Sequence, residues 1–176
     1  MCRSPGVPAI GGHTREAHAP NVTAQLSIVP AGGTDQTAIL ALAERLGPFG
    51  LATRPAQEIA TRERRALADA LEHPSPGSTL LVAKHQGLGV VGIVLLDTRR
   101  DYFTDDVHGH VAILAVAREA EGQGVGRALL RAAEDWGRDR GFRRLTLTVF
   151  ADNRRAKELY ARQGWRAELE THYKML

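Results

Sequence analysis

The sequence is poor in cysteine and in aromatic residues, and it has no long apolar run. Its single cysteine is Cys2, which argues against a disulfide framework, a cysteine-based metal site and a thiol nucleophile. No apolar segment approaches the roughly 20 residues that span a membrane. Residues 1–12 lack the apolar core of a signal peptide. These absences favour a protein of the reducing cytoplasm that has no membrane partner.

An excess of charge of one sign is also missing, because 23 Lys and Arg residues are balanced by 20 Asp and Glu residues. A net charge of +3 is too small to indicate nucleic acid as a partner, although it suits a small anionic ligand. The chain does have a hydrophobic content of 43%, which is enough for a packed core. We interpret residues 1–23, which are rich in Gly, Pro, Ala and His, as a flexible tail, and residues 24–176 as one domain.

The hydrophobic pattern of this domain changes repeatedly between the periods of strand and helix. Strands are predicted at 24–29, 78–84, 90–97, 110–117 and 143–150, with two short closing strands within 165–176. Helices are predicted at 34–46, at 58–71, from Val125 onward and at 152–163, whereas 99–109 is predicted to be an irregular polar loop. This order predicts an α/β fold in which four helices flank a mixed, mostly antiparallel, strongly twisted sheet of about seven strands.

Residues 87–92, GLGVVG, match the G-x-G-x-x-G fingerprint of dinucleotide-binding proteins. That fingerprint works only where a helix follows, because the pyrophosphate binds at the helix N-terminus. Here the apolar run VGIVLLD follows, which predicts a strand. We therefore interpret the glycines as part of a β-hairpin turn, and a nicotinamide-dependent oxidoreductase is kept only as a rival hypothesis.

A second glycine-rich stretch, EGQGVG at residues 121–126, has the context that the first one lacks. It follows the predicted buried strand HVAILAVA and precedes a helix whose apolar stripe includes Val125, Leu129 and Trp136. Glycines let several backbone N–H groups converge on one anion, and the helix N-terminus adds partial positive charge. No G-K-[ST] follows, so this is not a Walker loop. The stretch predicts a phosphate site, with a plain strand-to-helix turn as the alternative.

The motifs of the second half together resemble the GCN5-related N-acetyltransferase (GNAT) superfamily. The signature of that family, [QR]-x-x-G-x-[GA], is matched at Gly124 and Gly126, but its first position is Glu121 here. A second family feature, N-x-x-A-x-x-x-Y followed by G-[FW], is matched by NRRAKELY at 153–160 and GW at 164–165. A carboxylate at the first position would repel a pyrophosphate unless it points to solvent or caps the helix.

The resemblance covers residues 24–176 and implies acetyl-CoA as a co-substrate. By this resemblance, the pyrophosphate is bound by backbone amides of Gly122, Gln123, Gly124, Val125, Gly126 and Arg127. The backbone of Leu114, Ala115 and Val116 is expected to pair with the pantetheine arm like an additional strand. Asn153 matches a position that contacts the cofactor.

Acetyl transfer to an amine requires a base, a donor to the oxyanion and an acid for the leaving thiolate. The resemblance implies Tyr160 as the acid and the backbone N–H of Leu114 as the oxyanion donor. Some family members use a glutamate on the fourth strand as the base, and His110 occupies that position here. Others use a glutamate on the fifth strand, where this chain has Thr148, which cannot act as a base. A solvent-facing histidine and a water chain remain alternatives to this role of His110. His108 and His110 could suggest a metal, but no third ligand at a suitable spacing is evident, so no metal is expected.

The sequence thus predicts an acetyl-CoA-dependent N-acetyltransferase that acts on a primary amine by direct attack in a ternary complex. A non-catalytic acyl-CoA-binding module is the alternative. The acceptor, a small-molecule or peptide amine, stays open, as does the oligomeric state, for which a homodimer is one option. Residues expected at the rim of the acceptor site are Phe49, Arg54, Tyr102, Phe103, Asp105 and Asp106.

Overall fold

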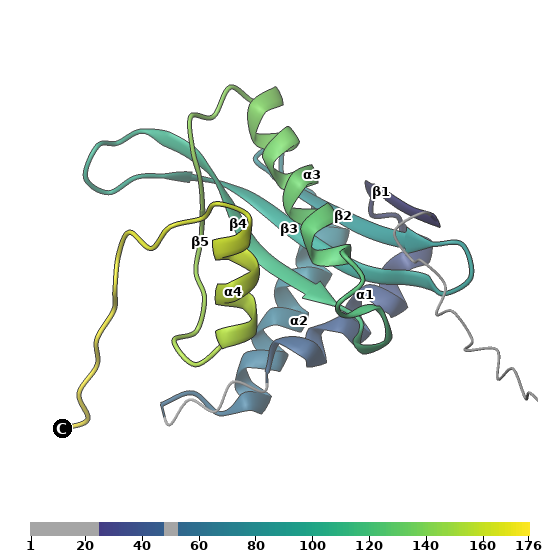
Figure 1. Ribbon diagram of the computed structural model, residues 1–176, viewed down its shortest axis with the longest axis horizontal. Helices are drawn as coiled ribbons and strands as arrows, with labels where there is room; N and C mark the ends of the chain where they lie inside the picture. The colour runs from purple at the N-terminus through teal and green to yellow at the C-terminus, as the bar shows by residue number, and fades with distance from the viewer. Residues whose placement is uncertain (1–24, 48–52) are drawn as a thin grey trace, which may run out of the picture.

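The computed structural model describes residues 25–47 and 53–176, so the predicted tail at 1–23 and Phe49 lie outside the described residues. A five-stranded sheet forms the centre of the molecule (Figure 1). Its strands, in spatial order, are β1 (Leu26–Pro30), β2 (Ser78–His85), β3 (Gly89–Arg100), β4 (Val107–Val116) and β5 (Leu145–Leu147). The first four pair antiparallel, whereas β5 pairs parallel with β4. The predicted α/β fold with a mixed, mostly antiparallel sheet is confirmed.

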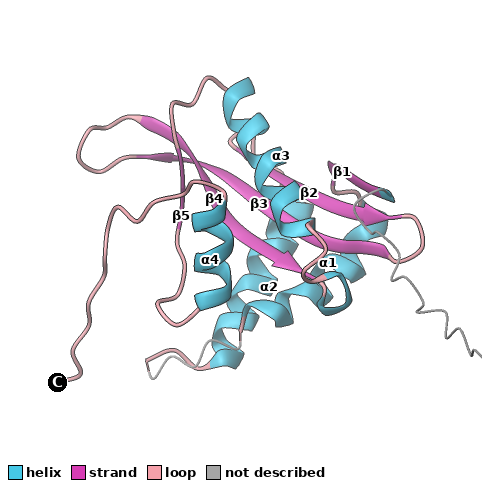
Figure 2. Ribbon diagram, in the orientation of Figure 1, coloured by secondary structure: helices cyan, strands magenta, loops and turns pink. Residues whose placement is uncertain are grey.

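Helices cover both faces of this sheet (Figure 2). On one face lie α1 (Gln36–Leu42), with short 3-10 helices before and after it at Gly33–Asp35 and Ala43–Leu46, and α2 (Ala56–Glu72). On the other face lie α3 (Val125–Asp139) and α4 (Arg154–Arg162). None of the helices among the described residues is long and apolar enough to cross a membrane.

The central strand β3 explains why both faces need covering. Its residues 91–96, VGIVLL, are all buried, although successive side chains of a strand point to opposite faces. Gly92 faces α3, where an added Cβ would lie 3.0 Å from atoms of both Leu129 and Val125. Burial between two helical layers thus explains the continuous apolar run, and glycine lets α3 approach the sheet closely.

The first glycine-rich stretch forms a hairpin turn, as predicted. It joins β2 to β3, which pair antiparallel from Ser78↔Asp97 to His85↔Gly89. The backbone N–H of Leu88 donates to the carbonyl oxygen of His85 at 3.2 Å, and Gly89 has a φ of 72°. A left-handed residue of this kind favours glycine. Residues 87–92 thus contain no helix N-terminus that could hold a dinucleotide.

Four details of the predicted secondary structure were wrong. The two ends of the predicted loop at 99–109 belong to strands, because Arg99 and Arg100 pair with His108 and Val107. The helix predicted at 34–46 is α-helical only over Gln36–Leu42. The strand predicted at 143–150 is reduced to Leu145–Leu147. The two closing strands are absent from the described residues 165–176, so the sheet has five strands rather than seven. Residues 166–176 are exposed throughout, which leaves them without the packing that stabilises a strand.

Candidate active site

A cavity opens where β4 and β5 part. The parallel ladder joins Gly109, His110 and Val111 to residues 145–147 and then stops, while β4 continues to Val116 with a partner only in β3. The register between β3 and β4 also shifts at this level, so that Ala112 is an additional residue on β4. The cavity has a volume of about 1140 Å³, and its walls include residues 111–116 and 147–150. The backbone of β4 is therefore accessible on the side that has lost its partner strand.

The second glycine-rich stretch lines the same cavity. Gly122 and Gly124 have φ values of 75° and 83°, a left-handed conformation that side chains with a Cβ rarely adopt. Gly126 serves another purpose, because an added Cβ would lie 3.0 Å from Cδ2 of Leu159 on α4. Two glycines therefore shape the loop, and the third allows α3 and α4 to pack closely.

The N-terminus of α3 points its free amides toward this cavity. Gly124 is the N-cap, no side chain caps the helix, and the first intrahelical bond runs from the Ala128 N–H to the Gly124 carbonyl at 3.0 Å. The amides of Val125, Gly126 and Arg127 precede that bond, so they have no acceptor within the helix. All three residues line the cavity. An uncapped helix start behind left-handed glycines is the arrangement that binds phosphate groups, and it fits the pyrophosphate of acetyl-CoA.

Glu121, the departure from the family signature, forms ion pairs with two arginines. Its two carboxylate oxygens accept hydrogen bonds from Arg45 and from Arg155. Partial burial alone would raise the pKa of Glu121, but the hydrogen bonds and charges of Arg155 and then of Arg45 lower it below its usual value. Arg45 Nε also donates to the Val116 carbonyl oxygen at 3.4 Å. The negative charge at this position is thus neutralised by two cations that line the cavity.

Asn153 and Tyr160 lie on one face of α4, as their spacing predicts, and both line the cavity. Asn153 is the N-cap of the helix, and its side-chain oxygen accepts from the Ala156 N–H at 3.1 Å. The Tyr160 ring lies 6.2 Å from that of Trp165, and burial raises the pKa of its phenol. A phenol with a raised pKa stays protonated near neutral pH, as a proton donor must.

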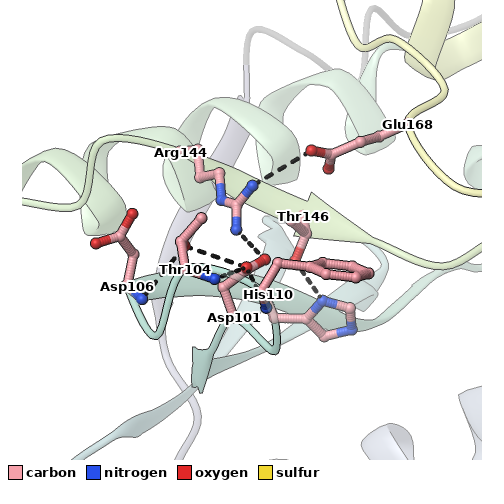
Figure 3. A network of polar contacts seen from close by, with 8 residues as sticks. Asp101, Thr104, Asp106, His110, Arg144, Thr146 and Glu168 are labelled. Carbon is pink, nitrogen blue, oxygen red and sulfur yellow. Dashed lines mark hydrogen bonds and ion pairs between the residues drawn. The ribbon is translucent and has the colours of Figure 1, made fainter.

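His110 is placed differently from the other predicted residues. It is 5% exposed, and its Nδ1 lies 2.8 Å from Oγ1 of Thr146 on the neighbouring strand (Figure 3). It lies outside the set of described residues that line the cavity. Burial, followed by the charges of Arg99 and His108, lowers the pKa of His110 to about 4. A buried imidazole with this pKa is a weak proton acceptor, so the geometry gives no support to His110 as the base.

A polar network beside His110 ties the β3–β4 hairpin to β5 (Figure 3). Asp101 accepts from the backbone N–H groups of Phe103 and Thr104 at 2.9 Å each, and it pairs with Arg144, which also pairs with Glu168. The Thr104 backbone bond and the other contacts lower the pKa of Asp101 to about 2, although partial burial opposes them. This network fixes the end of the hairpin at the start of β5.

The predicted rim residues separate into two groups. Arg54 lines the cavity, and so do all the residues predicted to bind the cofactor. Tyr102, Phe103 and Asp105 lie in the loop between β3 and β4, outside the cavity lining of the described residues, as does Asp106. The structure thus brings the predicted cofactor residues together and places the aromatic pair elsewhere.

One cavity residue, Glu63 on α2, was missed in the sequence analysis. The prediction of this helix depends on its apolar residues Ile59, Leu67 and Leu71 and assigns no role to its charged residues. Glu63 lies four residues from both Ile59 and Leu67, so it belongs to the buried stripe. A charged residue within an apolar stripe is the signal that could have identified it.

Similar solved structures share this fold. The aminoglycoside N-acetyltransferase AAC(6')-Iy, solved in complex with CoA, superposes with a TM-score of 0.64 at 16% identity, covering 86% of this chain and 94% of that chain. AAC(6')-Ih from Acinetobacter baumannii superposes with a TM-score of 0.63 at 15% identity, and the match covers 86% of this chain and 98% of that chain. A variant of the BH1408 protein from Bacillus halodurans superposes with a TM-score of 0.69 at 19% identity, and the match covers 85% of this chain and 99% of that chain. The fold of this chain is therefore shared with these solved structures.

A family model described as the acetyltransferase (GNAT) family matches residues 41–165, and the chain belongs to this family. Among curated proteins, the uncharacterized N-acetyltransferase YobR of Bacillus subtilis is 31% identical over 70 residues, which are 40% of this chain and 28% of YobR. The mycothiol acetyltransferase of Jonesia denitrificans is 45% identical over 60 residues, 34% of this chain and 19% of that protein. The matches thus span less than a third of each relative, and they support acyl transfer in general.

Proposed function

We propose that this protein transfers an acetyl group from acetyl-CoA to a primary amine by direct attack in a ternary complex. The observation that carries the proposal is one cavity that combines an uncapped helix N-terminus with the free backbone edge of β4. The first can bind the pyrophosphate of CoA, and the second can pair with the amide groups of its pantetheine arm. The glycine-rich loop that precedes this helix carries the family signature at Gly124 and Gly126, which supports the proposal.

The chain's own groups would divide the work as follows. The amides of residues 122–127 bind the pyrophosphate, and Leu114, Ala115 and Val116 align the pantetheine arm. The backbone N–H of Leu114 donates to the thioester oxygen as negative charge develops on it. Tyr160, whose pKa is raised by burial, donates its proton to the departing sulfur. Asn153 caps α4 and so fixes the start of the helix that carries Tyr160.

Direct attack is favoured over an acetyl-enzyme route because no cysteine occurs among the described residues that line the cavity. The structural neighbours include aminoglycoside N-acetyltransferases. We therefore expect a small-molecule or peptide amine as acceptor. A binding module without catalysis is the second candidate, because Thr148, which follows β5, cannot act as a base and His110 on β4 is buried.

Two-substrate kinetics test this proposal. Release of the free thiol of CoA is followed while acetyl-CoA and the amine are varied independently. A ternary-complex mechanism gives intersecting lines in double-reciprocal plots, and parallel lines would indicate an acetyl-enzyme intermediate and contradict direct attack. Tight binding of CoA without thiol release for any primary amine would favour the binding module.

A further inference from the structure

We propose that Glu63 binds the acceptor amine as its ammonium ion and takes the proton that the amine must lose before it attacks. This inference rests on the proposed N-acetyltransferase function and deepens it. It names the class of acceptor, a cationic primary amine, and it assigns the missing base to helix α2.

The position of Glu63 on its helix is unusual for a carboxylate. Ile59, one helical turn before it, is 8% exposed, and Leu67, one turn after it, is fully buried. Glu63 itself is half-buried and reaches the cavity. A charge in the core-facing stripe of a helix costs stability unless it has a partner. This cost is explained if the partner is a ligand of opposite charge.

The cavity has walls from both faces of the sheet. Glu63 comes from α2 on one face, whereas the phosphate-binding loop, α3 and α4 lie on the other (Figure 2). The opening between β4 and β5 therefore connects a side suited to CoA with a side that carries Glu63. An amine bound by Glu63 would approach the thioester from the face opposite α3.

The other carboxylates of the cavity are already accounted for. Glu121 is held by Arg45 and Arg155, and Asp152 is exposed at the start of α4. No cation forms an ion pair with Glu63 within residues 25–47 and 53–176. Among the described lining residues, Glu63 is thus the half-buried carboxylate that is available to a cationic ligand.

The charges around Glu63 suit proton transfer. Burial raises the pKa of Glu63, and the charge of Arg62 on the same helix only partly opposes this. Arg45 from the 3-10 helix after α1 is occupied by Glu121, and β4 and β5 contribute no titratable group within residues 111–116 and 147–150. The remaining ionisable groups of the cavity are Arg54 before α2, Arg127 on α3, and Arg154, Arg155, Tyr160 and Arg162 on α4, besides Asp152. A carboxylate whose pKa is nearer neutrality is a better base at physiological pH.

The proposed step balances as follows. The ammonium ion gives one proton to a carboxylate oxygen of Glu63, and the free amine attacks the carbonyl carbon of the thioester. A C–N bond forms, the C–S bond breaks, and the sulfur takes the proton of Tyr160. The second proton lost by the nitrogen restores the phenol, and Glu63 releases its proton to solvent. The products are the amide, free CoA and one proton.

Glu63→Gln tests the proposal with the least change of shape. The probes are spermidine, kanamycin and a tripeptide with a free N-terminus, each assayed with acetyl-CoA at pH 7. For an amine that the wild-type protein acetylates, we expect kcat/KM for the amine to fall by about 100-fold, a typical contribution of a general base. The KM for acetyl-CoA should change by less than about twofold, because the residues that bind CoA are untouched.

Glu58→Gln is the matched control, since Glu58 lies on the same helix but is exposed and outside the cavity lining. It should leave kcat/KM within about twofold of the wild-type value. The acid limb of the pH profile of kcat/KM should be present in the wild type and in Glu58→Gln and absent in Glu63→Gln. A loss below about threefold in Glu63→Gln, with the acid limb retained, would overturn the inference and leave the proposed function intact.

A binding measurement separates this inference from the proposed function. If the wild-type protein acetylates none of these three amines, the assay gives no support to the proposed function, and Glu63 is judged by calorimetry of spermidine and kanamycin with the protein–CoA complex. If Glu63→Gln binds these amines at least about tenfold more weakly than Glu58→Gln does, the result supports Glu63 as the residue that binds the ammonium ion. Equal affinity, or binding to neither variant nor wild type, overturns it.

Discussion

Glu121 and Arg155 form an ion pair that joins the glycine-rich loop to helix α4. The same carboxylate pairs with Arg45, so one residue links three segments that meet at the cavity. Similar loops carry Gln or Arg at this position, and a neutral or cationic group would not collect two guanidinium groups there. In this chain the carboxylate thus places positive charge beside the predicted phosphate site rather than opposing it.

The two ion pairs of Glu121 should contribute unequally to stability. The side chains of Arg45 and Glu121 are 29% and 23% exposed, whereas that of Arg155 is 64% exposed. Double-mutant cycles with Glu121→Gln, read by urea unfolding, should give a coupling of about 1 kcal/mol with Arg45→Gln and about 0.5 kcal/mol or less with Arg155→Gln. Because the pKa of Glu121 is lowered, this contribution is present at neutral pH and is lost as pH falls through that pKa. Equal coupling energies for the two pairs would contradict the prediction that the more buried pair with Arg45 contributes more.

Gly124 and Gly126 should respond differently to substitution by alanine. Gly124→Ala strains a backbone with φ of 83° and should cost about 1 kcal/mol in unfolding free energy. Gly126→Ala places a methyl group against Leu159, and Leu159→Ala should relieve that contact. Chemical denaturation of the three single variants, and of the two double variants that combine each glycine substitution with Leu159→Ala, measures these effects. Rescue of Gly124→Ala by Leu159→Ala would mean that both glycines are required for packing.

Tyr160→Phe removes the phenol that we assign as the acid and keeps the ring beside Trp165. We expect kcat to fall by about 100-fold while the KM for acetyl-CoA changes by less than about twofold. Initial-rate kinetics with an accepted amine measure both values. A kcat unchanged from that of the wild type would remove the acid role from Tyr160.

His110 should affect the pH dependence of stability more than catalysis. Its pKa is lowered from 6.5 to about 4 in the folded protein, so folding excludes a proton that the unfolded chain binds. The contribution of His110 to stability should therefore be constant above pH 6.5 and fall by roughly 2–4 kcal/mol between pH 6.5 and 4. In His110→Gln this component should be absent, and kcat should stay within about threefold. A large loss of kcat with an unchanged pH–stability curve would make His110 the base after all.

The predictable parts of the molecule were those with local signals. The run VGIVLLD predicts a strand, and the motif at 121–126 predicts a glycine-rich turn that leads into a helix. The spacing of Asn153 and Tyr160 likewise predicts one helix face. These features depend on the periods of strand and helix and on the freedom of glycine, which sequence shows directly.

The parts that could not be predicted depend on pairing between distant segments. The alternating pattern of residues 143–150 does not reveal that β5 leaves β4 after Leu147, and the burial of His110 results from its partner Thr146. Arg99 and Arg100 are polar and give no strand signal of their own, but they belong to β3 because they pair with residues of β4. Glu63 was visible as a charge in an apolar stripe, but only the cavity shows that the stripe faces a site.

The most direct test of the account is mass spectrometry of a panel of primary amines incubated with the full chain and acetyl-CoA. We expect at least one amine to gain a single acetyl group, with formation of an equal amount of free CoA and with no product when acetyl-CoA is omitted. Tight and saturable binding of CoA, with every amine recovered unmodified, would contradict the assignment of this cavity as the active site of an N-acetyltransferase.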